Sequence, residues 1–427
     1  NAEGRVLRDW YYLVLWKTWG NVPFYTENLT FPYIAEQLKA DEVYNNMVTD
    51  LEEVLDSKIL PMKRELAWAG RMTQAAAAMI YADYVMYQKD ESRYSKALGY
   101  VKEVIASGQY KLVTDYDDLF TYATEWSDEI ILDINYISAG GKRGWGDAGA
   151  CGGTVIPAMI GVDGLTYVGG QETGHGPYTE FEGGWGFCVI TRDAYEAFEP
   201  GDIRRDVAVL NLDTYQEEMM NRGIAVNYTG RYQNTGYFLR KYLGRPGGKA
   251  DQAGDADLNW ENNFHLYRYA ETLLVAAELA WRTNSGEAQG YFDQVRERAG
   301  LSPKAITEEA IMQERRVELL GEGKRYFDLV RFGKAAEVLK PGGGAIYVTK
   351  DAHRFVCTEG TVTQDKPKGE VKTNADGKPL NLVINGELKW TGTGAAIPQR
   401  PQWTENKKYL PIPQIEIESS HGATVQN

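Results

Sequence analysis

Large aromatic side chains flanked by glycine occupy residues 140–190, and they are the side chains of this chain best suited to hold a ligand. They are Trp145, Tyr167, Tyr178, Phe181 and Trp185. Glycine-rich segments do not form a regular helix or strand with one buried face, so we expect these rings on loops. A ring held on a loop can present its flat face to solvent. The apolar face of a pyranose sugar stacks on such a ring, so the sequence predicts a sugar-stacking surface.

Polar side chains that could bind the hydroxyl groups of a sugar accompany the rings. They are Arg143, Asp147, Gln171, Glu172 and His175. One ring that covers about 50 Å² of sugar contributes about 1 kcal/mol. Three rings and a few hydrogen bonds give a dissociation constant between about millimolar and tens of micromolar. That affinity is too weak for a protein that scavenges its ligand freely in solution, and it suits one that works at high effective concentration. The alternative is that Trp145 and Trp185 fill the core beneath the loops.

Other ligand chemistries are poorly matched by the sequence. Gly144, Gly146 and Gly149 have the spacing of a dinucleotide-binding motif, but they start well after the preceding strand, and no amphipathic helix opens at Gly149. The four histidines, His175, His265, His353 and His421, stand apart from one another. No zinc-binding spacing, nucleophile motif or phosphate-binding loop occurs. We therefore expect no metal, no cofactor and no catalytic residue.

Three carboxylates before a predicted strand, Glu125, Asp128 and Glu129, are the best candidates for a glycosidase acid/base pair. Clustered acids at such a junction are more often caps and solvated charges. We therefore expect a binding protein rather than an enzyme.

The amino-acid composition limits the classes of binding partner that the protein is expected to have. Lys and Arg number 46 and Asp and Glu 60 among 427 residues, so the net charge is −14 and disfavours nucleic acid and anionic membranes. Tyr (28) and Trp (11) together outnumber Phe (12). This excess favours partly solvated recognition surfaces, although tyrosines also line contacts between helices. The three cysteines lie far apart, and no apolar run reaches 18 residues.

Hydrophobic periodicity predicts helices at both ends of the chain. The expected helices cover 1–19, 41–56, 71–88, 92–106, 262–283, 286–299 and 306–322, with a strand at 129–137 and a short helix near 191–199. The predicted fold is mostly α: a superhelix of helix pairs resembling tetratricopeptide (TPR) repeats, with an interleaved loop-rich subdomain that contains short β-strands. The expected parts of this single unit are 1–137, a ligand-binding insertion at 138–261, 262–340, a second insertion at 341–402 and a tail at 403–427.

Four segments resemble the SusD/RagB family in the right order. The first is AEGRVLRDWYYLVLWKTWGNVPFYTE (2–27) and the second LAWAGRMTQAAAAMIYADYVMY (66–87). The third is NNFHLYRYAETLLVAAELAWRTN (262–284), and the fourth is ERRVELLGEGKRYFDLVRFG (314–333), followed by YLPIPQIEI (409–417). We expect the fourth segment to be structural, with Arg315, Arg316 and Arg325 paired to Glu314, Glu318 and Glu322.

The resemblance implies more than the residues show. It implies a non-catalytic lipoprotein on the outer-membrane surface of Bacteroidetes-type bacteria, which captures oligo- or polysaccharides, sometimes peptides, for a SusC-like TonB-dependent transporter. The chain lacks the family's first helices and lipidated cysteine, so any lipid anchor is expected outside these residues. A protein- or peptide-binding helical scaffold is the alternative function, followed by a glycoside hydrolase or lyase.

Overall fold

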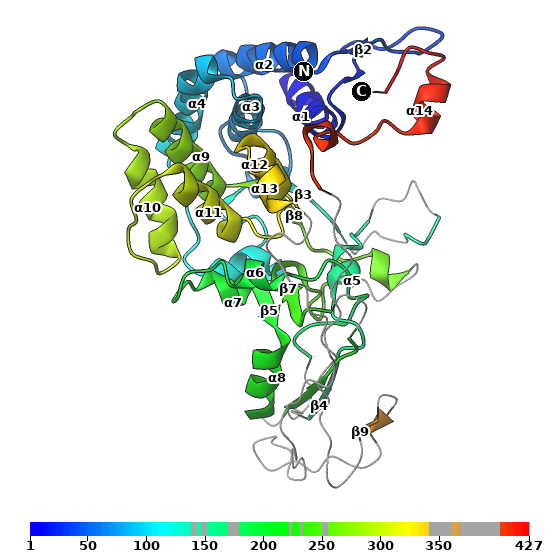
Figure 1. The fold of residues 1–427 in the computed structure, drawn as a ribbon, viewed down its shortest axis with the longest axis vertical. Helices are drawn as coiled ribbons and strands as arrows, with labels where there is room; N and C mark the ends of the chain where they lie inside the picture. The colour runs from blue at the N-terminus through cyan, green and yellow to red at the C-terminus, as the bar shows by residue number, and fades with distance from the viewer. Residues whose placement is uncertain are drawn as a thin grey trace.

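Helices and loops occupy separate parts of the molecule (Figure 1). The computed structural model describes residues 1–137, 143–146, 152–169, 179–221, 224–230, 234–249, 255–340, 362–363, 366–367 and 402–426. Helices from both ends of the chain gather in one part, here called the helical part. Short strands, short helices and loops from the middle of the chain form the other, here called the loop-rich part.

The helical part is a stack in which most helices pack against the next, while α11 packs against α9 and α12. Its helices are α1 (Ala2–Trp19), α2 (Ala40–Ser57), α3 (Gln74–Gln88), α4 (Tyr94–Ala106), α9 (Tyr269–Arg282), α10 (Ala288–Arg298), α11 (Glu308–Glu318), α12 (Arg325–Arg331) and α13 (Ala335–Val338). Contact between α4 and α9 joins the two runs, although the whole loop-rich part separates them in sequence. The predicted, mostly helical architecture of successive pairs is confirmed.

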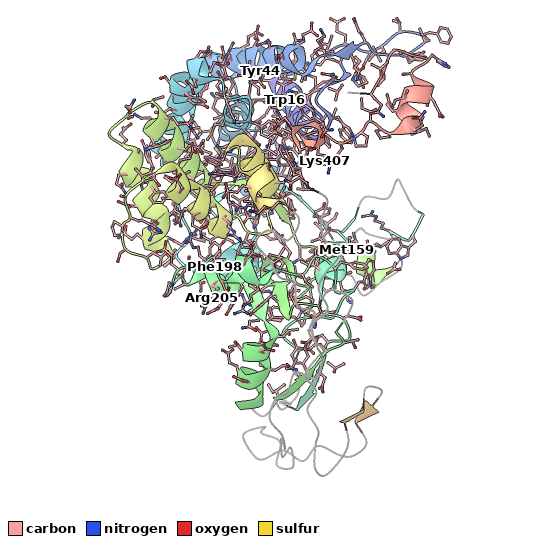
Figure 2. The ribbon with its side chains drawn as sticks, viewed as in Figure 1. Trp16, Tyr44, Met159, Phe198, Arg205 and Lys407 are labelled. Atoms are coloured by element: carbon pink, nitrogen blue, oxygen red, sulfur yellow. The ribbon has the colours of Figure 1, made fainter. Side chains whose placement is uncertain are left out.

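The central helix of this stack, α3, is buried on nearly every side. Four consecutive alanines, Ala75–Ala78, are at most 1% exposed, because small side chains let α2 and α4 approach closely. Thr73 caps the helix by accepting a hydrogen bond from the backbone N–H of Ala76 at 3.1 Å. Trp16 of α1 and Tyr44 of α2 stack in the same core with ring centroids 5.8 Å apart (Figure 2).

The loop-rich part has its own hydrophobic core, which includes Phe198, Leu210, Val226 and Phe238. Its elements are α5 (Ile156–Ile160), β4 (Thr166–Gly169), α6 (Arg192–Tyr195), α7 (Arg204–Ala208), β5 (Val209–Asn211), α8 (Leu212–Asn221), β6 (Ile224–Asn227) and β7 (Tyr237–Leu239). Strands β4 and β6 pair antiparallel, as do β5 and β7. Two-stranded ladders bury little by themselves, so this core depends on the loops that cover it.

A third antiparallel pair lies between the two parts. Strand β3 (Ile130–Ile134) pairs with β8 (Phe264–Arg268), which runs directly into α9. The prediction of one continuous helix over 262–283 is therefore wrong for its first turns. Within β8, His265 and Tyr267 alternate with the more exposed Phe264 and Leu266, which is a strand pattern. Five residues are too few to separate that pattern from the helical spacing that follows.

The remaining elements lie at the chain ends and in the second insertion. They are β1 (Val22–Pro23), β2 (Gln37–Leu38), β9 (Val362–Thr363), β10 (Lys366–Pro367) and α14 (Gln414–Ser419). The tail returns to α1, where the backbone N–H of Leu410 donates to the carbonyl of Thr18 at 2.8 Å. Both chain ends consequently lie in one region (Figure 1). Among the described helices, none has the length and apolar character needed to cross a bilayer.

Buried ion pairs tie the two parts together. The carboxylate of Glu318, at the end of α11, accepts hydrogen bonds from Arg204 at 2.8 Å, Arg268 at 2.6 Å and Arg298 at 2.6 Å. Glu322 in turn binds Arg268 and Lys241, each at 2.8 Å. Since Arg204 and Lys241 belong to the loop-rich part, the charges of residues 314–333 connect it to the helices.

The expected structural role of this segment therefore fits its geometry, but the expected pairings within it are wrong. Arg315 binds Asp328 at 2.9 Å and Glu271 at 3.1 Å. Arg316 binds Asp193 at 2.9 Å. Neighbouring arginines and glutamates on one helix point to different sides, so their partners come from other elements.

Candidate functional site

Three aromatic rings form a row at the surface, here called the aromatic row: an exposed Trp145, a half-buried Trp185 and an exposed Phe187. The ring centroids of Trp145 and Trp185 lie 5.8 Å apart with an interplanar angle of 30°. Phe187 follows at 6.3 Å from Trp185, nearly perpendicular at 72°. Trp145 is 66% exposed and Phe187 48%, so the row faces solvent. This exposure excludes the alternative that Trp145 fills the core, whereas Trp185 is half-buried, so the same alternative is not excluded for it.

A hydrogen bond fixes the most exposed ring of the row. The indole Nε1–H of Trp145 donates to a carboxylate oxygen of Asp255 at 2.5 Å. The backbone at Arg143 is held as well, because its carbonyl accepts from the N–H of Asp255 at 3.1 Å and from the side chain of Asn259 at 3.0 Å. The indole is thus exposed and also oriented, which reduces the entropy lost when a ligand stacks on it.

Backbone hydrogen bonds to α5 position the other two rings. The N–H of Trp185 donates to the carbonyl of Ala158 at 2.7 Å, and that of Phe187 to the carbonyl of Met159 at 2.9 Å. Figure 2 labels Met159, so the reader can locate α5 and the loop bound to it. A Cβ atom at Gly184 would lie 2.4 Å from the Ala158 carbonyl oxygen and 2.6 Å from the Cα of Gly161. Only glycine therefore lets the loop approach α5 this closely.

Two predicted stacking residues have other surroundings. Phe181 is 1% exposed, and the guanidinium groups of Arg240 and Arg245 lie 5.5 and 5.6 Å from its ring. The prediction that Phe181 stacks on a ligand is therefore wrong, because its ring belongs to the second core. Tyr167 is half-buried on β4, and its hydroxyl accepts from the N–H of Phe181 at 3.2 Å and lies 3.1 Å from that of Tyr215.

Of the remaining predicted ligand-binding residues, the structure describes only Arg143. Arg143 is half-buried beside the row and donates to the carbonyl of Gly153 at 3.4 Å. The others lie outside the described residues: Asp147, Gln171, Glu172, His175 and Tyr178. Sequence reasoning missed Phe187 and Asp255. The run GWGF offered a signal for Phe187, since Gly186 separates two rings on one short loop. No local pattern links Asp255 to Trp145.

The three candidate carboxylates do not converge as an acid/base pair. Glu129 is 0% exposed and binds Arg268 at 2.9 Å and Arg298 at 3.1 Å, so the expectation of a cap or solvated charge is wrong for it. Asp128 is exposed and pairs with Lys63, as expected. Glu125 is half-buried, and burial raises its pKa to about 7. Among the described residues, no three His, Cys, Asp or Glu side chains gather in the manner of a metal site.

A large groove lies elsewhere. A groove of about 800 Å³ runs between α1, the segment 22–28 and the tail, and it contains no predicted site residue. Leu7, Tyr11 and Tyr25 line it, and they are 41%, 56% and 50% exposed. Polar groups such as Arg8 and Glu416 stand among these apolar walls. Volume alone therefore does not identify the site, because oriented and exposed rings occur in the shallower aromatic row.

Comparison with known proteins decides the family. The model of the SusD family matches residues 128–427 of the chain. The chain belongs to the SusD family. The resemblance of the four ordered segments is thereby confirmed, and so is the TPR-like helical fold that it implied.

Solved structures of SusD-like proteins superimpose on most or all of the chain. Surface glycan-binding protein A from Bacteroides thetaiotaomicron is 38% identical, with a TM-score of 0.76 over 100% of this chain and 77% of that one. The same protein was solved in complex with laminarihexaose. A laminarin-binding SusD-like protein is 32% identical, with a TM-score of 0.68 over 79% of this chain and 71% of that one.

Curated relatives are more distant and longer. SusD-like protein P25 from Formosa agariphila is 26% identical over 369 residues, which cover 79% of this chain. The match spans 64% of the length of that relative. The starch-binding protein SusD from Bacteroides thetaiotaomicron is also 26% identical, over 77% of this chain and 63% of its own length. The name of the second relative describes it as a binding protein.

Proposed function

We propose that this SusD-family protein binds a glycan without cleaving it, and that the aromatic row is its stacking surface. The observation that carries the proposal is a pair of oriented indoles, an exposed Trp145 and a half-buried Trp185, 5.8 Å apart on a surface loop pair. Exposed indole faces are costly to keep in water, and sugar faces cover them well. The predicted ligand-binding insertion at 138–261 contains the whole row and remains part of this proposal.

A laminarin-type glucan is the first ligand to test. The 38% identical relative was solved with laminarihexaose, and the 32% identical one is named for laminarin binding. A stretched row of rings suits a chain of neutral sugars, because each ring can meet a successive unit. Starch is the comparison ligand, since the more distant relative at 26% identity is named for starch binding.

Delivery to a transporter completes the proposed role. By analogy with the family, the bound glycan passes to a SusC-like TonB-dependent transporter, and the protein sits on the outer-membrane surface through a lipid anchor outside these residues. The modest affinity expected of a few stacked rings agrees with this role, because a tethered protein works at high effective concentration.

Calorimetry against laminarin, laminarihexaose and starch tests the proposal. Trp145→Ala and Trp185→Ala should each lower the affinity for the glycan that binds, by about fivefold or more, since each ring contributes about 1 kcal/mol. Phe31→Ala is the matched control, because Phe31 is 84% exposed and lies outside the row. Unchanged affinity in both tryptophan variants rejects the row as the site. Sustained release of shorter oligosaccharides rejects the non-catalytic role.

Binding of a protein segment is the second candidate function. The 800 Å³ groove along α1 favours it, because its walls combine exposed aliphatic and aromatic side chains in the way that helix-binding grooves do. Tyr11→Ala should then weaken a complex with a purified SusC-like transporter, measured by surface plasmon resonance. An unaltered complex, together with glycan binding that depends on the aromatic row, rules this candidate out.

A further inference from the structure

A second pocket, distinct from the aromatic row, has the features of a ligand site. It encloses about 240 Å³ between the segment that precedes α3 and the segment that leads into β3. Its walls include Lys63, Arg71, Trp126 and Asp128, and it shares no residue with the aromatic row. We propose that this pocket binds a neutral sugar unit of the same glycan, as a second contact on a long chain; this inference rests on the proposed glycan binding.

An exposed indole beside the pocket is held in a fixed orientation. Trp68 does not line the pocket itself but lies between two lining residues, Leu66 and Ala69. It is 56% exposed, and the guanidinium of the lining residue Arg71 lies 5.2 Å from its ring. The Arg71 guanidinium in turn donates two hydrogen bonds, of 2.8 and 3.0 Å, to the carboxylate of Glu3 in α1. A guanidinium on one face of an indole leaves the opposite face for a ligand. The arrangement resembles that of Trp145, whose exposed ring is oriented by Asp255.

The backbone of the pocket is strained where a second indole enters it. Trp126 has φ of +66°, a left-handed conformation that is unfavourable for a bulky residue. Gly70, with φ of +84°, makes room for it: a Cβ there would lie 3.4 Å from the Trp126 ring and 2.0 Å from the side-chain nitrogen of Asn135. Strain of this kind gathers at ligand sites, where it fixes a side chain in a required position.

Hydrogen-bonding groups in the pocket are available to a polyol. In the described part of the chain, the Ser127 hydroxyl and the Arg64 Nε are buried atoms without a hydrogen-bond partner. An unpaired buried polar atom costs free energy unless something fills the space beside it. Both residues line the pocket, so a small movement of either side chain would bring its unpaired atom to a hydroxyl group bound there.

The charges indicate a neutral ligand. Lys63 pairs with Asp128 at 2.8 Å, and Arg71 pairs with Glu3, which also binds Arg64. Each of these cations therefore has a carboxylate partner, although Arg64 and Arg71 share Glu3, and the pairing lowers the attraction of the pocket for an acidic sugar. The volume is below the roughly 300–1,000 Å³ of sites for drug-sized molecules, which suits one or two sugar units.

Two kinds of variant separate this pocket from the aromatic row. Isothermal titration with laminarihexaose should give two sites per chain for the unaltered protein and one site for Trp68→Ala. The affinity for long laminarin should fall about tenfold or more in Trp68→Ala and in Arg71→Ala, because two linked contacts reinforce each other. Ile59→Ala is the matched control: Ile59 is 70% exposed, precedes the same segment and does not line the pocket.

A direct readout follows the indole itself. With 5-fluorotryptophan incorporated, the ¹⁹F signal that Trp68→Phe removes should shift on adding laminarihexaose, even when Trp145 and Trp185 are both replaced by alanine. A signal that does not move, with one site per chain and unchanged laminarin affinity in Trp68→Ala, overturns the pocket and leaves the proposed function standing. Absence of glycan binding in the unaltered protein overturns both. Circular dichroism shows whether each variant is folded.

Discussion

Trp145 and Asp255 meet through a single hydrogen bond of 2.5 Å, although they come from opposite ends of the loop-rich segment. The bond joins an indole N–H to a carboxylate, so it directs the ring and leaves its face open. Exposed indoles without such a partner rotate between rotamers and lose entropy when a ligand orders them. The orientation of Trp145 is therefore a property of the free protein.

Replacing Asp255 should weaken glycan binding without removing any ring. We expect Asp255→Ala to lower the affinity about three- to tenfold, because a hydrogen bond of this kind contributes about 0.5–1.5 kcal/mol and 1.4 kcal/mol is a factor of ten. Asp255→Asn keeps an acceptor and should restore most of the affinity. Calorimetry on both variants measures this. Equal losses in Asp255→Ala and Asp255→Asn would contradict an orienting role.

A methyl group at Gly184 should displace the loop that carries Trp185 and Phe187. A Cβ there would lie 2.4 Å from the Ala158 carbonyl oxygen, so the loop has to move away from α5. Gly184→Ala should cost about 1–3 kcal/mol of unfolding free energy and lower glycan affinity.

The control for this variant is Gly99→Ala in α4, where a Cβ meets nothing within 4 Å. That change should leave glycan affinity unaltered and stabilise the fold by about 0.5–1 kcal/mol. Urea unfolding and calorimetry report the two quantities. A Gly184→Ala protein with ordinary affinity would show that the loop does not need its contact with α5.

Removing one carboxylate from the buried ion cluster should destabilise the whole protein. Glu318 is 0% exposed and holds three arginines, so Glu318→Gln leaves positive charge buried without its partner. We expect a loss of about 3–5 kcal/mol, seen as a lower urea midpoint. Glu103→Gln breaks an exposed pair with Lys58 and should hardly change the midpoint. Similar midpoints for the two variants would refute the structural role of the cluster.

Acid should unfold the protein through the same cluster. Burial alone would raise the pKa of Glu322, but the charges of Arg268 and Lys241 outweigh burial and lower this pKa to about 2. The pKa of Glu318 is likewise held well below its ordinary value, since Arg298, Arg268 and Arg204 outweigh burial. A lowered folded-state pKa stabilises the fold above the ordinary value of 4.5, and this stabilisation is lost as pH falls toward 2.

Unfolding free energy measured from pH 7 to pH 3 checks this dependence. It should be nearly constant above pH 5 as far as these two groups are concerned and should drop below it. Glu322→Gln should start lower at pH 7 and fall less steeply. A variant that falls as steeply as the unaltered protein would assign the acid sensitivity to other carboxylates.

Regular periodicity let the sequence predict most helices closely. The expected 1–19 and 41–56 correspond to α1 and α2 within one residue at each end. Short elements were harder, because four or five residues carry no clear period, and α6 (Arg192–Tyr195) is shorter than the predicted 191–199. The ten-residue helix α8 (Leu212–Asn221) was not predicted either. Glycine flanks predicted exposure well for Trp145 and failed for Phe181, whose ring turns into the second core.

Partners distant in sequence could not be predicted at all. Arg204 meets Glu314 across 110 residues, and Trp145 meets Asp255 across the same number. The resemblance to a family supplied the order of the segments but no pairings. The arginine-dense run at 314–333 therefore indicated a charged helix surface. In the fold, most of its charged side chains are buried away from water.

The shared glutamate at the end of α11 also limits how such a chain can diverge. A loop that touches sugar can exchange its aromatic residues one at a time, since each ring acts almost independently. Arg268 cannot be lost alone, because Glu318 and Glu322 would both remain ionised in a dry interior. We expect related sequences that lack this arginine to have lost one of the two acids as well. Ligand specificity can then change by single substitutions, whereas the buried charged residues are substituted together.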